Sequence, residues 1–261
     1  MTLPTYPHFI TALEDGTATL CIDRPDVRNA MNHECWRDLR DFIDFCDHCP
    51  QIRVIILTGG GDSVFISGQD IHSLQGMTYE EAAHGYSVEA IRKIESCTKP
   101  VIAAVNGTAL GGGFELALCC DFRIVSEHVK FGLPESNLGL LPGLGGTQRL
   151  PRLIGIGRAK EVILANRLIT AQEAVDFGLA MKAVPSTELM KEARALARRL
   201  AKKSPAALNY GKKVINASEY ADPFTGLLLE GTAFDAMLRL EDTHEGINAF
   251  LEKRAPVFHG N

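Results

Sequence analysis

The chain has 261 residues, of which 46% are hydrophobic and 23% charged, and a formal net charge of -5. This length supports one large domain, or one domain with an appendage, whose core needs no metal or disulfide. The acidic balance argues against nucleic acid or an anionic membrane as a partner. Seven scattered cysteines, an odd number, argue against a disulfide framework and favour a reducing, cytoplasmic compartment.

The N-terminal half alternates expected strands with expected helices. Residues 9–13 and 17–22 are expected to form a hairpin. A helix is expected to follow from about 32 to 46, with an apolar stripe formed by Trp36, Leu39, Phe42 and Ile43. Residues 53–58 and 100–106 are apolar runs closed by glycines, which is typical of buried strands. The alternation predicts an α/β layer arrangement with functional groups at the turns that leave the strands.

The chain changes character from about residue 187. Leu189, Ala193, Leu196 and Leu200 have the spacing of an amphipathic helix, and the remainder to residue 255 is expected to be helical with breaks at Pro205 and Pro223. We therefore expect a core over residues 1–195 and a helical C-terminal region over residues 196–261.

Several common motifs are incomplete. Gly155-Ile-Gly157 lacks the third glycine of a dinucleotide fingerprint, and residues 211–213 lack the Ser or Thr of a phosphate loop. Cys46 and Cys49 have the CxxC spacing but no second ligand pair, so no metal site is expected. The basic run over residues 194–203 has helical spacing and is interpreted as a solvated face, with an RNA-binding surface as the alternative.

Two carboxylates stand alone in apolar surroundings. Glu115 is the only charged residue between Pro100 and Cys120, and Glu135 is the only one between Lys130 and Arg149. An ionised side chain is rarely buried without a purpose, and perturbed carboxylates concentrate at working sites. The pair suggests acid/base chemistry. The glycine-rich apolar run around Glu115 is too polar to span a membrane.

The run Gly111-Gly112-Gly113 is expected to open a helix. The first turn of a helix presents N–H groups without internal partners, which attract an oxyanion, and glycine lets a ligand approach the backbone. Glu115 would lie on this first turn, on nearly the same face as Gly112. The alternative is that Glu115 only caps its own helix, but its apolar flanks are unlike the mixed start of a surface helix.

These motifs together carry a family resemblance. The strings from Arg24-Pro25 to Asn29-Ala30, FISGQDI, VNGTALGGGFELAL, FGLPESNLGLLPGLGGTQRL and INAFLEKR resemble, in order and spacing, the crotonase (enoyl-CoA hydratase/isomerase) superfamily. The resemblance covers nearly the whole chain. It implies a spiral of ββα units with a helical C-terminal region that forms trimers, usually paired into hexamers. It also implies acyl-CoA thioesters as substrates and no separate cofactor, since coenzyme A is part of the substrate.

The resemblance also implies roles for individual residues. The backbone N–H groups of Gln69 and Gly112 would form the oxyanion hole, while Glu115 would deprotonate water and Glu135 would protonate Cα. The matching positions for substrate and CoA contacts are Arg28, Asn29, Ala30, Ser67, Asp70, Ile71 and, from a neighbouring subunit, Phe234 and Lys253. One departure is Gln69, because many hydratases carry Ala there. Gln at this position leaves the acyl group open.

The leading interpretation is therefore an enoyl-CoA hydratase, which adds water across a trans-2-enoyl-CoA to give a 3-hydroxyacyl-CoA or catalyses the reverse dehydration. The nearest alternative is an enoyl-CoA isomerase, which moves the double bond without adding water. The alternative from another class is a non-catalytic CoA-binding or RNA-binding protein. The two glutamates argue against this last reading, as does the acidic charge for RNA.

Overall fold

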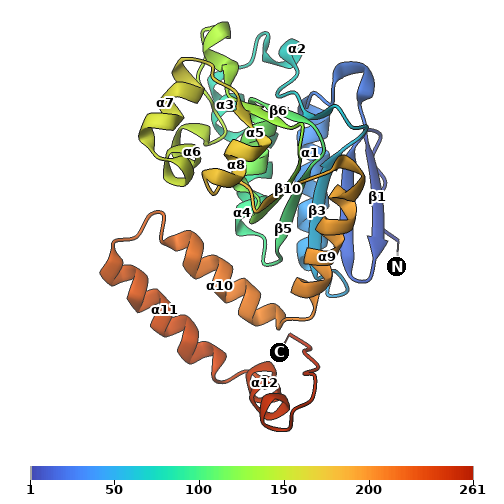
Figure 1. The fold of residues 1–261 in the computed structure, drawn as a ribbon, viewed down its shortest axis with the longest axis vertical. Helices are drawn as coiled ribbons and strands as arrows, with labels where there is room; N and C mark the ends of the chain where they lie inside the picture. The colour runs from blue at the N-terminus through green and yellow to red at the C-terminus, as the bar shows by residue number, and fades with distance from the viewer. Residues whose placement is uncertain (1, 261) are drawn as a thin grey trace.

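A computed structural model describes residues 2–260, in which two β-sheets are wound together with helices and the last three helices extend away from them (Figure 1). The strands are β1 (Phe9–Glu14), β2 (Thr17–Ile22), β3 (Val54–Gly59), β4 (Val64–Ile66), β5 (Val101–Val105), β6 (Thr108–Leu110), β7 (Phe122–Ser126), β8 (Lys130–Gly132), β9 (Ile169–Thr170) and β10 (Lys182–Val184). The predicted hairpin and the two predicted buried strands, β3 and β5, are confirmed with boundaries shifted by a residue or two.

The strands pair in an alternating order that makes the fold a spiral. One sheet has the order β1-β2-β3-β5-β7-β10 and the other the order β4-β6-β8-β9. Each consecutive pair, β3 with β4, β5 with β6 and β7 with β8, therefore places its first strand in the larger sheet and its second in the smaller. Apart from the β1-β2 hairpin and the β8-β9 pair, neighbouring strands run parallel. The predicted spiral of ββα units is confirmed.

Helices cover the sheets and fill the connections between strands. They are α1 (His33–His48), α2 (Ile71–Leu74), α3 (Tyr79–His84), α4 (Tyr86–Ser96), α5 (Gly112–Cys119), α6 (Gly146–Ile154), α7 (Ile156–Leu164), α8 (Ala171–Asp176) and α9 (Leu189–Ala201), with short 3-10 turns at Pro25–Val27, Pro134–Leu138 and Ser186–Glu188. The predicted helices around residues 32–46 and 189–200 are confirmed as α1 and α9.

The larger sheet is buried on both faces, which explains the unbroken apolar runs of its central strands. Alternate residues of β3 point into opposite layers: Ile55 and Leu57 join the cluster that contains α1, while Val54 and Ile56 pack with α9. Every residue of β3 and of β5 is buried. Parallel strands covered on both faces read as continuous hydrophobic runs rather than alternating ones.

The C-terminal helices α10 (Pro205–Ala217), α11 (Pro223–Met237) and α12 (Glu241–Leu251) extend from the core (Figure 1). Pro205 and Pro223 each stand in a first helical turn, where a missing N–H has no cost, so the predicted breaks are confirmed. The expected division between residues 195 and 196 falls within α9 and stays a prediction. Within residues 2–260, no helix has the length and apolarity needed to span a bilayer.

Candidate functional site

The glycine turn before α5 sets the position of that helix. Gly111 is the N-cap residue, with φ 51° and ψ -129°, a conformation that a residue with a β-carbon rarely adopts. At Gly113 a β-carbon would lie 2.3 Å from the carbonyl oxygen of Ile66. The start of α5 therefore sits directly against β4, at a separation that only glycine permits.

This approach brings two backbone N–H groups together. A β-carbon on Gly112 would lie 3.7 Å from the nitrogen of Gln69, and one on Gly68 would lie 3.8 Å from the nitrogen of Gly112. Among the hydrogen bonds of residues 2–260, none uses the N–H of Gln69 or of Gly112 as donor. The two groups that the sequence singled out are thus neighbours, and both keep a donor for a ligand.

Glu115 lies in the first turn of α5 but does not cap its own helix. Its Oε1 accepts hydrogen bonds from the N–H groups of Leu144, at 2.7 Å, and of Gly146, at 2.8 Å. The side chain is buried, and burial raises its pKa to about 7 against the lowering effect of these two bonds. The nearby charge of Glu135 raises the pKa further, whereas that of Arg149 lowers it. Glu115 can therefore exchange a proton near neutral pH.

Glu135 also lies next to the glycine turn. It belongs to the 3-10 turn Pro134–Leu138 that follows β8, and its Oε1 would lie 3.1 Å from a β-carbon on Gly111. Its Oε2 is buried and has no hydrogen-bond partner in the described residues. Burial raises the pKa of this carboxyl. Glu135 thus lies next to Gly111, and the N–H of Gln69 lies next to Gly112.

Arg149 in α6 holds the loop that contacts Glu115. Its guanidinium donates to the carbonyl of Leu144 at 2.7 Å and pairs with Glu95 at 2.6 Å. Since Leu144 also donates its N–H to Glu115, one peptide segment connects the partly buried Arg149 to this carboxylate. The loop conformation depends on Gly145, which has φ 100°, and a β-carbon at this position would collide with the guanidinium of Arg149.

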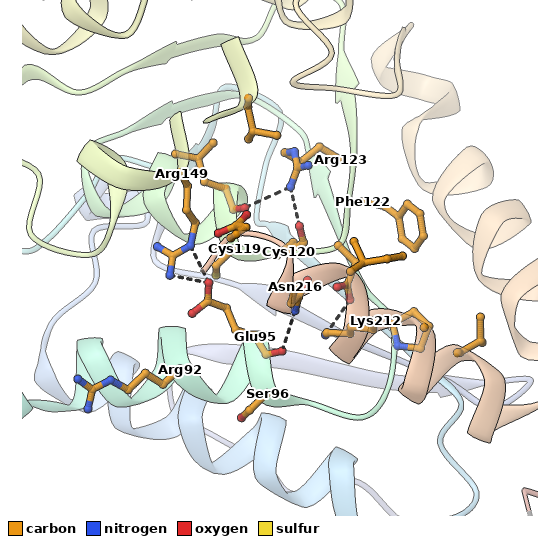
Figure 2. A pocket seen from close by; sticks show the side chains of 18 of the residues that line it. Arg92, Glu95, Ser96, Cys119, Cys120, Phe122, Arg123, Arg149, Lys212 and Asn216 are labelled. Carbon is orange, nitrogen blue, oxygen red and sulfur yellow. Dashed lines mark hydrogen bonds and ion pairs between the residues drawn. The ribbon is translucent and has the colours of Figure 1, made fainter. Parts of the chain in front are cut away.

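The same arginine lines a cavity of about 820 Å³ between α10 and the core, beside the C-terminal end of α5. Figure 2 shows the pair formed by Arg149 and Glu95 on its wall, with Lys212 of α10 entering from the opposite side. Lys212 pairs with Asp121 at 2.9 Å. Neither Glu115 nor Glu135 lines this cavity, so it is separate from the pair of carboxylates.

The residues near the N-terminus that are predicted to hold CoA lie beside residues 68–70, the segment that carries the N–H of Gln69 and is called the oxyanion peptide below. Met31 N–H donates to the carbonyl of Gly68, and the N–H of Asp70 donates to the carbonyl of Met31. This bridge places the segment Arg28, Asn29 and Ala30 next to Ser67, Asp70 and Ile71. Ser67 N–H also donates to the carbonyl of Arg28, and Ile71 is 56% exposed.

Asn29 has a structural side chain. It is buried, its Oδ1 accepts from the N–H of Arg24, and its Nδ2 donates to the carbonyls of Gly60 and Val64. Any contact of Asn29 with CoA therefore has to use its backbone. Arg28 and Asn29 both have positive φ, 54° and 56°, so the chain turns sharply here.

Phe234 and Lys253 are not brought to the site within one chain. Phe234 lies on α11 and is 62% exposed, and Lys253 follows α12. Figure 1 places α11 and α12 at the opposite end of the molecule from α2, which begins next to Gln69. Their predicted role from a neighbouring subunit stays a prediction.

Sequence reasoning missed three contributors. For the N–H groups of Leu144 and Gly146, the sequence offers one signal, the cluster of glycines over residues 143–146, which is typical of close backbone approach but does not identify a partner. Trp36 was assigned to the apolar stripe of its helix, yet its Nε1 donates to the Oε1 of Gln69 at 2.6 Å. Its buried indole is the single tryptophan of the chain, and a buried Trp N–H usually needs an acceptor.

Comparisons with known proteins agree with this geometry. A model of the enoyl-CoA hydratase/isomerase family matches residues 13–261. The crotonyl-CoA hydratase of Syntrophomonas wolfei is 41% identical over 97% of this chain and 98% of its own. The short-chain-enoyl-CoA hydratase of Clostridium acetobutylicum is 40% identical over 92% of this chain and 93% of its own. The crystal structure of an enoyl-CoA hydratase from Bacillus anthracis superposes with a TM-score of 0.92 at 37% identity, covering 97% of this chain and all of that one.

The chain belongs to the enoyl-CoA hydratase/isomerase family. The predicted superfamily is thereby confirmed, as is the prediction of an enzyme of the hydratase type.

Proposed function

We propose that this protein adds water across the double bond of a trans-2-enoyl-CoA to give a 3-hydroxyacyl-CoA, and catalyses the reverse dehydration. The observation that carries the proposal is the grouping of two carboxylates, the buried Glu115 and the partly buried Glu135, with two donor N–H groups around one glycine turn. Relatives at 40% and 41% identity are named as hydratases of short enoyl-CoA and crotonyl-CoA. A short trans-2-enoyl-CoA is therefore the first substrate to test.

The reaction builds negative charge on the thioester oxygen. Water oxygen bonds to Cβ, the electron pair of the double bond moves towards Cα and the carbonyl, and an enolate forms. The N–H groups of Gln69 and Gly112 stabilise this oxyanion without reorganisation, because the turn already holds them in place. Removing one such donor from an enzyme typically costs about 3 kcal/mol in the barrier.

Two protons must also move, and the surroundings divide this work between the carboxylates. Glu115 accepts two backbone hydrogen bonds, which stabilise its ionised form against the opposing effect of burial. With a pKa of about 7, its ionised form is present near and above neutral pH and takes the proton of the attacking water. Glu135 has an unpartnered buried Oε2 and a pKa raised by burial, which favour its neutral form, so it gives a proton to Cα. Proton exchange between the two carboxyls and solvent then restores the starting state. Because neighbouring carboxyls titrate together, kinetic pKa values describe the pair.

The coenzyme A portion of the substrate is proposed to lie along the backbone of residues 28–30, close to Ser67, Asp70 and Ile71. Phe234 and Lys253 would contact it from a neighbouring subunit of a trimer or hexamer. The exposed apolar residues of α11, which include Phe224, Leu227 and Leu228, support such self-association. The proposed reaction uses only carboxyl groups and backbone N–H groups of the protein, with coenzyme A as part of the substrate. We also propose a cytoplasmic location.

The test is a comparison of wild-type protein with Glu115→Gln and Glu135→Gln on crotonyl-CoA and longer enoyl-CoAs. Loss of the enone absorbance is followed, and product mass is measured. Each substitution is expected to lower kcat about 10²- to 10⁴-fold. The exposed residue Glu127 provides the matched control, since Glu127→Gln alters the same charge away from the glycine turn. A product of unchanged mass with a moved double bond would assign an isomerase instead, and absence of turnover by wild-type protein would refute the proposal.

A further inference from the structure

The side chain of Gln69 is held at both ends by the protein. Its Oε1 accepts from the indole Nε1 of Trp36 at 2.6 Å, and its Nε2 donates to Oγ of Ser73 at 2.9 Å. Ser73 Oγ in turn donates to the carbonyl of Asp70 at 2.7 Å. Both amide atoms of Gln69 are therefore bound by the protein, and these two hydrogen bonds fix the side chain within it.

The indole of Trp36 also reaches the second oxyanion residue. A β-carbon on Gly112 would lie 3.5 Å from the Cζ2 atom of Trp36, which means that the ring edge packs against the glycine backbone. One rigid, buried side chain therefore contacts Gln69 by a hydrogen bond and Gly112 by packing. These are the two residues whose N–H groups lie next to each other.

The position of Trp36 is itself fixed from the backbone side. Asn32 caps α1 by accepting from the N–H of Cys35, and the N–H of Trp36 donates to the carbonyl of Asn32. Immediately before this cap, Met31 forms the backbone bridge to the segment around Gln69. The start of α1 thus contacts the oxyanion peptide at two points, through the backbone of Met31 and through the indole of Trp36.

We propose that Trp36 is a positioning residue that aligns the two oxyanion N–H groups, acting through the side chain of Gln69. This rests on the proposed function for the identity of the oxyanion, although the donor geometry itself does not depend on the acyl group. Without the indole N–H, the side chain of Gln69 loses its hydrogen bond to α1, and only the backbone bridge of Met31 still holds the peptide to the start of that helix. The N–H of Gln69 can then shift relative to that of Gly112. A misplacement of about 1 Å at a reacting centre can lower a rate about 100-fold.

The test uses Trp36→Phe, Gln69→Met and the double variant. Trp36→Phe removes the N–H and keeps an aromatic ring, while Gln69→Met keeps the length of the side chain without its amide. We expect Trp36→Phe to lower kcat about 10- to 100-fold with KM changed less than about threefold, since the lost alignment acts on the transition state. The double variant is expected to lose no more than the worse single variant, because the two residues act through one contact.

A second measurement does not require turnover. A 3-oxoacyl-CoA such as acetoacetyl-CoA can lose its α-proton and present an enolate oxygen to the same donors, and the bound enolate has its own absorbance band. Trp36→Phe should weaken this band at a given ligand concentration about 10-fold or more. Binding of butyryl-CoA, which is saturated, should change less than about threefold.

The matched control is Phe42→Leu, a change of another fully buried aromatic residue on α1. It should lower thermal stability as much as Trp36→Phe while leaving kcat and the enolate band within about twofold of wild type. If Trp36→Phe behaves like this control, or if its effect and that of Gln69→Met add, the inference is overturned. The inference is also overturned if Gln69→Met alters KM, measured across acyl chains of different length, more than it alters kcat, because the side chain would then select the substrate. Failure of wild-type protein to hydrate any enoyl-CoA would refute only the proposed function, because the enolate band still measures the alignment.

Discussion

The burial of Glu115 predicts an unusual pH dependence of stability. Its pKa rises from 4.5 to about 7 on folding, mainly because burial disfavours the charged form. One pKa unit corresponds to about 1.4 kcal/mol, so ionising Glu115 in the folded protein destabilises it by about 3 kcal/mol. Between pH 4.5 and about 7 the unfolded chain has lost this proton while the folded chain keeps it. The free energy of unfolding contributed by Glu115 therefore falls as the pH rises through this window.

Replacing Glu115 by Gln removes the titration and keeps an oxygen for the N–H groups of Leu144 and Gly146. We expect the free energy of unfolding of Glu115→Gln, relative to that of wild type, to increase by about 3 kcal/mol from about pH 4.5 to about pH 8. This expectation concerns the change across the range and holds for any difference at about pH 4.5. Urea unfolding of both proteins at several pH values and one protein concentration measures the gap. Glu127→Gln, a change at an exposed position, serves as the control and should show no such trend.

A gap between wild type and Glu115→Gln that stays constant within about 0.5 kcal/mol over this range would refute the reasoning. It would mean that Glu115 ionises at the same pH in the folded and unfolded chain. The two backbone hydrogen bonds and the charge of Arg149 would then balance the effect of burial, and Glu115 would be ionised at neutral pH.

Three further predictions concern the surroundings of the site. Gly113→Ala should lower the free energy of unfolding in urea by more than about 4 kcal/mol, because its β-carbon would lie 2.3 Å from a carbonyl oxygen. The control Gly157→Ala, whose β-carbon would meet nothing within 4 Å, should change it by less than about 1 kcal/mol, and equal effects would contradict the packing. Arg149→Met should raise the pKa of Glu115 and so move the acidic limb of the pH profile of kcat/KM to higher pH, lowering kcat/KM about tenfold near pH 6.5. Arg149→Lys should give an intermediate shift. An unmoved acidic limb would contradict the effect of Arg149 on Glu115. Asn29→Ala should cost about 2 to 4 kcal/mol in thermal or urea unfolding, because a buried side chain loses three hydrogen bonds to the backbone. A loss below about 1 kcal/mol would argue that water replaces them.

The sequence by itself determined the parts of this protein that follow from local chemistry. The apolar runs of β3 and β5 predicted buried strands, and Pro205 and Pro223 marked the starts of helices, because each depends on side chains or backbone limits within a few residues. The isolation of Glu115 and Glu135 among apolar residues likewise pointed to the two carboxylates, since burying a charge without a purpose is costly.

Only the tertiary structure decided which groups those residues meet. Glu115 accepts from N–H groups 29 and 31 residues further along the chain, and Trp36 donates to a glutamine 33 residues away. These contacts arise because successive turns of the spiral bring their loops to one place, and no local pattern specifies how two loops approach each other. For the same reason Asn29, expected near CoA, has a side chain committed to the carbonyls of Gly60 and Val64. A sequence shows which residues are unusual, whereas their partners depend on long-range packing.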